Sequence, residues 1–128
     1  YREYVKHPGG VCVVPLTDEN EVMLVRQYRY VYGKEIIEIP AGKRDGKDED
    51  VLEGAKRELK EELGIEAENF YYLGEMYPTP GYTDEILFMF AATSLTFGET
   101  NPDEDEFVEP ERIHIDTLPF DYIRTFKL

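Results

Sequence analysis

Short apolar runs separated by polar turns make up the beginning of the chain. Residues 10–16 (GVCVVPL) and 21–26 (EVMLVR) flank the turn TDEN, and this pattern predicts a β-hairpin. Residues 35–39 (EIIEI) predict a further strand that ends at Pro40, because proline cannot donate a hydrogen bond to a strand ladder. We therefore expect β-structure throughout this part of the chain.

The spacing of apolar residues changes to a helical period between residues 48 and 63. They form a stripe about 120° wide on a helical wheel: Val51, Leu52, Ala55, Leu59 and Leu63. Asp48 or a neighbour can cap the start of this helix, and Gly64 is placed to end it. We expect the helix to pack its apolar stripe on a sheet.

The second half of the chain returns to strand-like patterns. Residues 70–73 (FYYL), 86–92 (ILFMFAA) and 112–115 predict strands, and Asp116 can cap a C-terminal helix that runs through Thr125. Strands outnumber helices, and the strong helix interrupts them. This order predicts a mixed sheet with helices packed on it, an α+β arrangement, instead of a doubly wound parallel fold.

The acidic residues of the helix break the usual charge preference at its C-terminal end. Glu61 and Glu62 occupy the last turn, where the helix dipole favours cations. With Glu58 they fall within an arc of about 100°, and like charges at this spacing cost about 0.2–0.5 kcal/mol per pair. A solvated face with ion pairs such as Glu53–Arg57 and Arg57–Glu61 explains a single glutamate of this kind. Three clustered carboxylates indicate a bound cation.

Composition narrows the class of protein. The chain has 128 residues and a formal charge of −14, which argues against nucleic-acid binding and against a free anionic substrate unless metal ions intervene. No apolar run reaches the roughly 20 residues of a membrane span, and no signal peptide is recognisable. Cys12 is the single cysteine, so nothing indicates an oxidising compartment, and we expect a cytoplasmic protein.

Residues 57–65 read RELKEELGI, and seven residues separate Glu49 from Arg57. This segment resembles the signature of the Nudix hydrolase family, G-x5-E-x7-R-E-U-x-E-E-x-G-U, in which U is an apolar residue. Six residues instead of five separate Gly42 from Glu49, and we interpret the difference as a one-residue insertion in the loop 43–48. The arginine, the glycine and the spacing together make this match far more specific than any single glutamate.

The resemblance implies a Nudix-type α/β/α sandwich around a mixed sheet, formed by a single domain over residues 1–128. The chain starts at Tyr1 without a methionine and stops at Leu128, so we expect residues to be missing at one or both ends. The chain also resembles the ADP-ribose pyrophosphatase branch of the family, whose members are usually dimers, often through an N-terminal segment that is short or absent in this sequence. The resemblance therefore leaves a homodimer open.

The resemblance also implies a metal site. Glu58 and Glu62 would be direct ligands, Glu61 a ligand directly or through water, and the carbonyl oxygen of Ala41 a further ligand. Arg57 would orient the glutamates and be held by Glu49 in turn. All these donors are oxygens, and only His7, His114 and Cys12 offer softer atoms, so Mg²⁺ or Mn²⁺ is favoured over zinc.

Further segments resemble the ADP-ribose pyrophosphatase branch of the family. Pro80 follows Ile65 by fifteen positions, near the branch's marker proline, and residues 80–85 (PGYTDE) are similar to its P-G-aromatic-x-D-E segment. Residues 25–29 (VRQYR) and 38–42 (EIPAG) resemble the segments around its substrate pocket. The implied reaction hydrolyses a nucleoside diphosphate sugar, with ADP-ribose as the first choice. An ordinary tight turn is the alternative explanation for Pro80 alone.

This branch assignment implies roles for individual residues. Arg29 would pair with a phosphate or the terminal ribose, Glu38 with a ribose hydroxyl, and Tyr28 would stack on adenine; Pro80 would line the pocket. In the acidic loop DEDE, Glu104 would be the general base and Glu106 an accessory metal ligand. A solvated acidic turn is the alternative for that loop.

Two other functions remain open on the sequence. One is a Nudix hydrolase of another specificity, for a GDP-sugar, a dinucleoside polyphosphate or a damaged nucleotide. The other is a non-catalytic Nudix domain that binds a nucleotide or a protein and regulates it. The intact glutamates count against the second of these.

Overall fold

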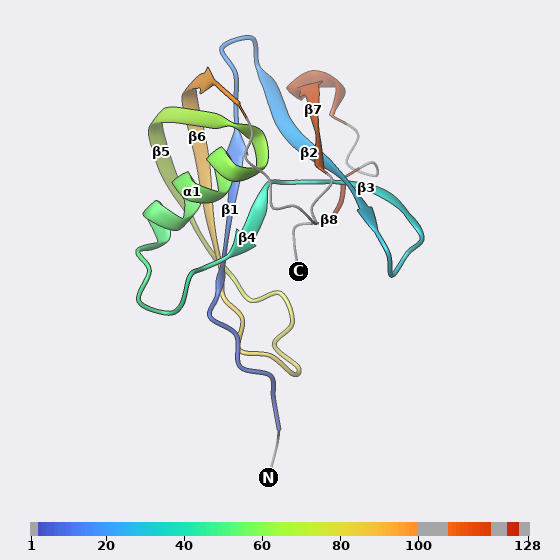
Figure 1. The fold of residues 1–128 in the computed structure, drawn as a ribbon, viewed down its shortest axis with the longest axis vertical. Coiled ribbons are helices and arrows are strands. Elements are labelled where there is room, and N and C mark those ends of the chain that lie inside the picture. Colours follow the sequence, from blue (N-terminus) through green and yellow to red (C-terminus); the bar gives the residue numbers. More distant parts are fainter. Residues whose placement is uncertain (1–2, 100–107, 119–122, 126–128) are drawn as a thin grey trace.

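Within the described residues, the strands form two four-stranded sheets, and one α-helix packs on the first of them (Figure 1). The computed structural model describes residues 3–99, 108–118 and 123–125. In order across the first sheet, the strands are β4 (Ala41–Lys43), β1 (Gly10–Pro15), β6 (Leu87–Phe97) and β5 (Ile65–Met76). In the second sheet they are β7 (Val108–His114), β2 (Glu21–Arg29), β3 (Lys34–Glu38) and β8 (Ile123–Thr125).

Both sheets are mixed. β1 runs parallel to β6, and β3 runs parallel to β8, whereas the other pairings are antiparallel. The expected α+β class, a mixed sheet with a packed helix, is confirmed. The hairpin predicted from residues 10–26 is reduced to its turn: Leu16 and Val22 form one antiparallel bridge, and the Thr17 N–H donates to the carbonyl oxygen of Glu21 at 2.8 Å. Beyond this turn the strands separate, because β1 pairs with β4 and β6, and β2 pairs with β3 and β7 in the other sheet.

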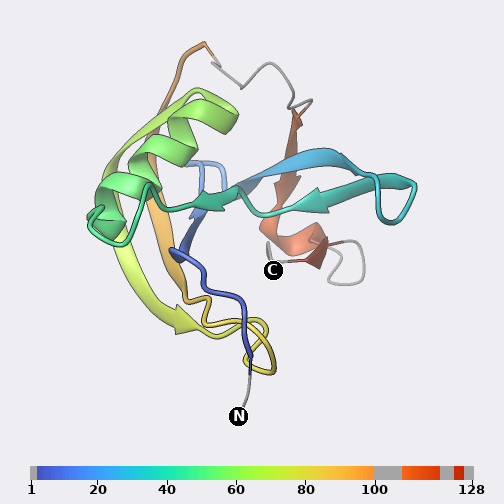
Figure 2. The same cartoon turned by 60° about the horizontal axis from the view of Figure 1, so that its bottom comes forward.

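The side chains of β1 alternate between two clusters of the hydrophobic core. Val11 and Val13 lie in a cluster with the apolar stripe of the helix α1 (Val51–Leu63), whereas Cys12 lies in a cluster with Leu24 and Ile37 of the second sheet. Successive side chains of a strand point to opposite faces, so β1 contacts both layers. Figure 2 shows α1 lying along the first sheet while β2 and β3 project away from it.

Helix α1 begins three residues after the start of the predicted range 48–63 and ends as predicted. Asp50, not Asp48, is the N-cap, and its Oδ1 accepts from the backbone N–H groups of Leu52 at 2.8 Å and Glu53 at 3.4 Å. Gly64 ends the helix in the left-handed conformation at φ +66°, and its N–H donates to the carbonyl oxygens of the last turn. This is the arrangement that glycine stabilises at a helix C-terminus.

The predicted C-terminal helix from Asp116 through Thr125 is wrong. Ile115–Thr117 form one turn of 3₁₀-helix, and Ile123–Thr125 form strand β8. Leu118 is extended at φ −66° and ψ 109° and precedes Pro119, which disfavours the helical conformation for the residue before it.

In the part of the chain that the structure describes, no helix has the length and apolar character needed to cross a membrane.

The C-cap of α1 allows a test of the packing around it. Gly64→Ala should destabilise the fold more than Gly33→Ala, although both glycines have φ near +65°. A Cβ on Gly64 would lie 2.7 Å from the carbonyl oxygen of Gly98, whereas a Cβ on Gly33 would meet nothing within 4 Å. We expect about 1–2 kcal/mol lost at Gly33 from backbone strain alone, and a larger loss at Gly64, measured by urea unfolding. Equal losses would contradict the packing argument.

Candidate active site

Two carboxylates on successive turns of α1 are buried at the edge of the core. Glu58 is 8% exposed and Glu62 is 6% exposed, whereas the side chain of Glu61 remains 44% exposed. Burying a carboxylate is costly unless hydrogen bonds or a cation compensate. The helix therefore holds its acids where a partner of opposite charge is required.

Gly42 of β4 makes room for the Glu58 carboxyl group. A Cβ placed on Gly42 would lie 2.1 Å from the carboxyl carbon of Glu58 and 2.2 Å from each of its oxygens. Only glycine at this position lets the carboxylate approach the backbone of β4 so closely. The neighbouring Ala41 is buried and pairs with Cys12 of β1, so this contact joins α1 to the first sheet.

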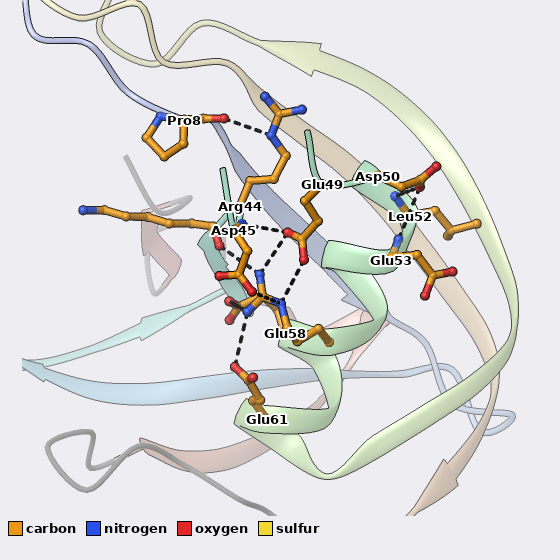
Figure 3. A network of polar contacts seen from close by, with 11 residues as sticks. Pro8, Arg44, Asp45, Glu49, Asp50, Leu52, Glu53, Glu58 and Glu61 are labelled. Atoms are coloured by element: carbon orange, nitrogen blue, oxygen red, sulfur yellow. Dashed lines mark hydrogen bonds and ion pairs between the residues drawn. The ribbon is translucent and has the colours of Figure 1, made fainter. Parts of the chain in front are cut away.

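The Arg57 guanidinium joins the surrounding acidic groups, of which Figure 3 labels Glu49, Glu58 and Glu61. It donates to both carboxylate oxygens of Glu49, at 3.1 and 3.2 Å, and to Glu58 at 2.8 Å and Glu61 at 3.4 Å. A further N–H donates to the carbonyl oxygen of Lys43 at 3.0 Å. The structure thus brings Arg57 together with Glu49, Glu58 and Glu61.

This network shifts the pKa values of its members. Hydrogen bonds from Arg57 hold the pKa of Glu49 below its ordinary value, and the hydrogen bond to Glu49, followed by the charge of Glu58, raises the pKa of Arg57. Both groups are therefore more firmly ionised than in an unfolded chain. Glu53, which also stands four residues from Arg57, pairs instead with Lys56 at 3.6 Å.

The loop before α1 accommodates the extra residue of the signature. Gly46 turns at φ +86°, and its N–H donates to the carbonyl oxygen of Arg44 at 2.9 Å. The Asp45 N–H donates to Glu49 Oε1 at 2.8 Å, so the loop closes on the same carboxylate that holds Arg57. Gly54 allows this approach, because a Cβ there would lie 2.8 Å from Glu49 Oε1.

The predicted substrate residues of β2 and β3 are only partly brought together. Arg29 forms a two-point ion pair with Glu38, at 2.5 and 2.7 Å, and Glu38 is 1% exposed. Tyr28 is largely exposed and neighbours Arg29 along the strand, so the two side chains point to opposite faces of the sheet. Adenine stacked on Tyr28 would therefore lie on the other side of the sheet from a phosphate held by Arg29.

Two cavities lie side by side near the N-terminal segment and share Glu85. The larger, of about 670 Å³, is lined by residues that include Tyr4, Tyr77, Pro80, Gly81, Asp84 and Glu85. The smaller, of about 80 Å³, is lined by His7, Gly10, Ala41, Gly42, Lys43, Glu85 and Leu87. Pro80 lines the larger cavity, and the smaller cavity reaches the backbone of β4 that contacts Glu58.

The comparison with known proteins decides the family. A model of the NUDIX domain matches residues 6–127. The chain belongs to the Nudix hydrolase family. The segment from Gly42 to Ile65 is the Nudix signature with one residue inserted.

Named relatives include enzymes and an activator. A methanol dehydrogenase activator from Bacillus methanolicus is 44% identical over 117 residues, which cover 90% of this chain and 63% of that protein. An ADP-ribose pyrophosphatase from Bacillus subtilis (strain 168) is 44% identical over 110 residues, which cover 84% of this chain and 59% of that protein.

A solved structure described as that of an ADP compounds hydrolase has a TM-score of 0.77 at 28% identity and covers 85% of this chain and 58% of that one. This chain therefore spans about three-fifths of the length of the proteins it matches.

The donor chemistry of the Nudix helix fits a hard divalent cation. Glu58 and Glu62 offer buried carboxylate oxygens, and the cradle at Gly42 brings one of them against the backbone next to Ala41. Among the described residues no group of three or more His, Cys, Asp or Glu side chains is gathered for a metal ion. Glu104 and Glu106 lie outside the described residues, so a metal site in this Nudix domain stays a prediction.

Sequence reasoning missed two residues of this region. His7 and Glu85 both line the smaller cavity and contact each other at 3.2 Å. Glu85 belongs to the PGYTDE segment, in which the resemblance to the branch indicated Pro80 as the substrate-binding residue. His7 carried no signal of its own, because its partners lie far along the chain.

The Arg57–Glu49 pair should make stability depend on pH. Because the folded pKa of Glu49 lies below its ordinary value of 4.5, the pair stabilises the fold above that pH and loses its effect as pH falls through the folded pKa. Glu49→Gln should therefore be less stable than the parent at pH 7 and lose less free energy of unfolding on acidification. Urea unfolding at pH 7, 5 and 3 measures both effects.

Glu53→Gln is the control for this experiment, because Glu53 is exposed on the same helix and does not contact Arg57. The free energy of unfolding of Glu53→Gln should change with pH in the same way as that of the parent. Parallel curves for the parent and Glu49→Gln would show that the Arg57 network does not stabilise the fold.

Proposed function

We propose that this Nudix domain hydrolyses the pyrophosphate bond of a nucleoside diphosphate sugar, with ADP-ribose as the preferred candidate and AMP and ribose 5-phosphate as products. The observation that carries the proposal is the burial of both Glu58 and Glu62 on one helix, with Glu58 against Gly42 and bound by Arg57. The similarity to ADP-ribose pyrophosphatases supports the choice of substrate.

The carboxylates of α1 would hold Mg²⁺ or Mn²⁺ in this function. Glu58 and Glu62 are the proposed ligands, with Glu61, Glu106 and the carbonyl oxygen of Ala41 completing the set. The cation would neutralise the acidic cluster and polarise the pyrophosphate of the substrate. This role accounts for binding an anionic substrate by a chain with a net charge of −14.

The larger cavity supports a sugar as one part of the substrate. Asp84 and Glu85 offer carboxylate oxygens that can accept from hydroxyl groups, while Tyr4, Tyr77 and Pro80 provide flat apolar surface. Carboxylates do not suit a phosphate, so this cavity favours the ribose end of ADP-ribose over its pyrophosphate. We assign Pro80 to this sugar subsite.

The remaining residues position the reacting groups. Arg29 would bind a phosphate through several N–H groups at once, and the buried Glu38 would hold its guanidinium in place. Glu104 would take a proton from a water molecule, whose oxygen forms a bond to phosphorus. The bond from that phosphorus to the bridging oxygen breaks, and each product leaves with one phosphate.

A second candidate function is regulation of another enzyme. It is favoured by the relative named as a methanol dehydrogenase activator, which is as similar in sequence as the pyrophosphatase. In that case the domain would act on a dehydrogenase or on a nucleotide that the dehydrogenase uses. The intact glutamates of the signature favour hydrolysis in either setting.

A substrate screen tests the proposed specificity. The purified chain with Mg²⁺ should release AMP from ADP-ribose faster than it acts on a GDP-sugar, a dinucleoside polyphosphate or an oxidised nucleoside triphosphate. Products are identified by chromatography and mass spectrometry. Hydrolysis of a GDP-sugar without action on ADP-ribose would overturn the assignment, and ADP-ribose binding without hydrolysis of any substrate would favour a regulatory domain.

Two carboxylate variants separate metal binding from proton transfer. Glu62→Gln should lower kcat by about 100-fold or more and raise the Mg²⁺ concentration for half-maximal rate, because it removes a ligand oxygen charge. Glu104→Gln should lower kcat by about 100-fold with an unchanged Mg²⁺ requirement, because it removes only the base. Steady-state rates over a Mg²⁺ series measure both.

Glu53→Gln again serves as the matched control, since it removes an exposed glutamate of the same helix. It should leave kcat and the Mg²⁺ requirement unchanged. If Glu62→Gln hydrolyses substrate at the parental rate, the proposed metal site is wrong.

A further inference from the structure

The N-terminal segment, residues 5–9, lies along the loop 77–86 that forms the proposed sugar subsite (Figures 1 and 2). The Val5 N–H donates to the carbonyl oxygen of Tyr82 at 2.6 Å, and the Asp84 N–H donates to the carbonyl oxygen of Val5 at 3.2 Å. The His7 N–H donates to Asp84 Oδ1 at 2.7 Å. Backbone and Asp84 contacts therefore fasten the segment without the imidazole ring.

The other end of this segment is joined to the loop of the Nudix signature. Arg44 Nε donates to the carbonyl oxygen of Pro8 at 2.9 Å, and the Arg44 backbone N–H donates to that of Gly9 at 2.9 Å (Figure 3). The guanidinium also lies over the ring of Phe88 at 5.3 Å. The segment thus bridges the sugar subsite and the carboxylate site.

The imidazole ring of His7 is oriented by its own turn. The Gly9 N–H donates to His7 Nδ1 at 2.9 Å, and Gly9 reaches this position with φ +95°, a conformation that favours glycine. An acceptor at Nδ1 places the proton of the neutral ring on Nε2. That nitrogen faces Glu85 Oε2 at 3.2 Å, and both side chains are mostly buried, at 17% and 12% exposed.

Glu85 occupies the wall that the two cavities share. Its carboxylate faces the small cavity beside Ala41 and Gly42, and it also lines the larger cavity with Pro80 and Tyr77. With the sugar in the larger cavity and the pyrophosphate at the carboxylates of α1, as proposed above, Glu85 would stand between them. Its direction therefore matters for substrate binding.

We propose that His7 is a positioning residue, which holds the Glu85 carboxylate toward the sugar of the substrate from the N-terminal segment. The proposal rests on the function proposed above and adds a residue to it. His7 acts through Glu85 and does not touch the reacting phosphorus. It should therefore affect the binding of substrate and not the chemical step.

Kinetics of three variants test this role. His7→Ala should raise KM for ADP-ribose about tenfold, the effect of losing one hydrogen bond to a charged group, with kcat changed less than about twofold. His7→Gln, whose side-chain amide can donate from a similar position, should restore KM to within about threefold of the parent. Glu85→Gln should raise KM, and adding His7→Ala to it should raise KM no further.

The other histidine of the chain provides a matched control. His114 Nδ1 also accepts from the N–H two residues later, that of Asp116 at 3.1 Å, but His114 lies at the end of β7 and lines neither cavity. His114→Ala should leave KM and kcat unchanged. Thermal unfolding of all variants checks that each is folded.

A binding measurement separates failure of this proposal from failure of the proposed function. Calorimetric titration with the non-hydrolysable α,β-methylene analogue of ADP-ribose, in the presence of Mg²⁺, should show about tenfold weaker binding for His7→Ala than for the parent. If the parent binds but hydrolyses nothing, the proposed hydrolysis fails, and the ratio of dissociation constants still decides the role of His7. If the parent neither binds nor hydrolyses a nucleoside diphosphate sugar, both proposals fall.

Nuclear magnetic resonance provides a direct check of the geometry. The ¹⁵N shifts of the His7 ring should show the proton of the neutral ring on Nε2, and Glu85→Gln should move the Nε2 resonance. The proposal would be overturned by a proton on Nδ1 or by an Nε2 chemical shift that Glu85→Gln leaves unchanged. A His7→Ala variant with lower kcat at unchanged KM would overturn it as well.

Discussion

The Arg57 guanidinium is the cation on which the acidic side of α1 depends. It binds Glu49 and Glu58 and reaches Glu61, while the last turn of the helix carries only Lys60 as a basic residue. Buried carboxylates without such a partner would be neutralised or would destabilise the helix. The same guanidinium binds the carbonyl oxygen of Lys43, so it also fastens the loop that precedes α1. The position of that loop and the lowered pKa of Glu49 are therefore set by one group.

The close approach of α1 to the first sheet follows from the same geometry. Glu58 enters the space that Gly42 leaves open, and Leu59 packs beside it against the β1 valines. The polar contact of Glu58 and the apolar contact of Leu59 come from adjacent residues of the helix. A movement of α1 that broke one contact would therefore disturb the other. The N-terminal segment adds a second bridge, because Arg44 and His7 connect the signature loop to the loop at Pro80. Through these contacts, α1, the N-terminal segment and the loop at Pro80 meet around the β4 backbone.

Local patterns were enough to predict the helix, its apolar stripe and the stop at Gly64, because each depends on neighbouring residues. The set around Arg57 was predicted from the resemblance to the Nudix signature, which fixes the spacing of Glu49, Arg57 and the glutamates of the helix. The C-terminal helix was mispredicted because Asp116 can cap a helix, whereas Pro119 disfavours the helical conformation at Leu118. The contact of His7 with Glu85 could not be predicted, because 77 residues separate them and no periodic pattern relates them. Likewise, Asp84 is chemically similar to Glu85, yet only the structure shows that it fastens the backbone of His7.

The one-residue insertion before Glu49 has a consequence for how members of this family are recognised. The extra residue is contained in the tight turn at Gly46, and the Glu49 carboxylate still reaches Arg57 from the end of the loop. In this chain the contact between Glu49 and Arg57 is kept, although one more residue separates the first glycine from the first glutamate than in the signature. A pattern that demands fixed spacing would reject this chain. A pattern anchored on the helix, with a gap of variable length before it, would retain it and others like it.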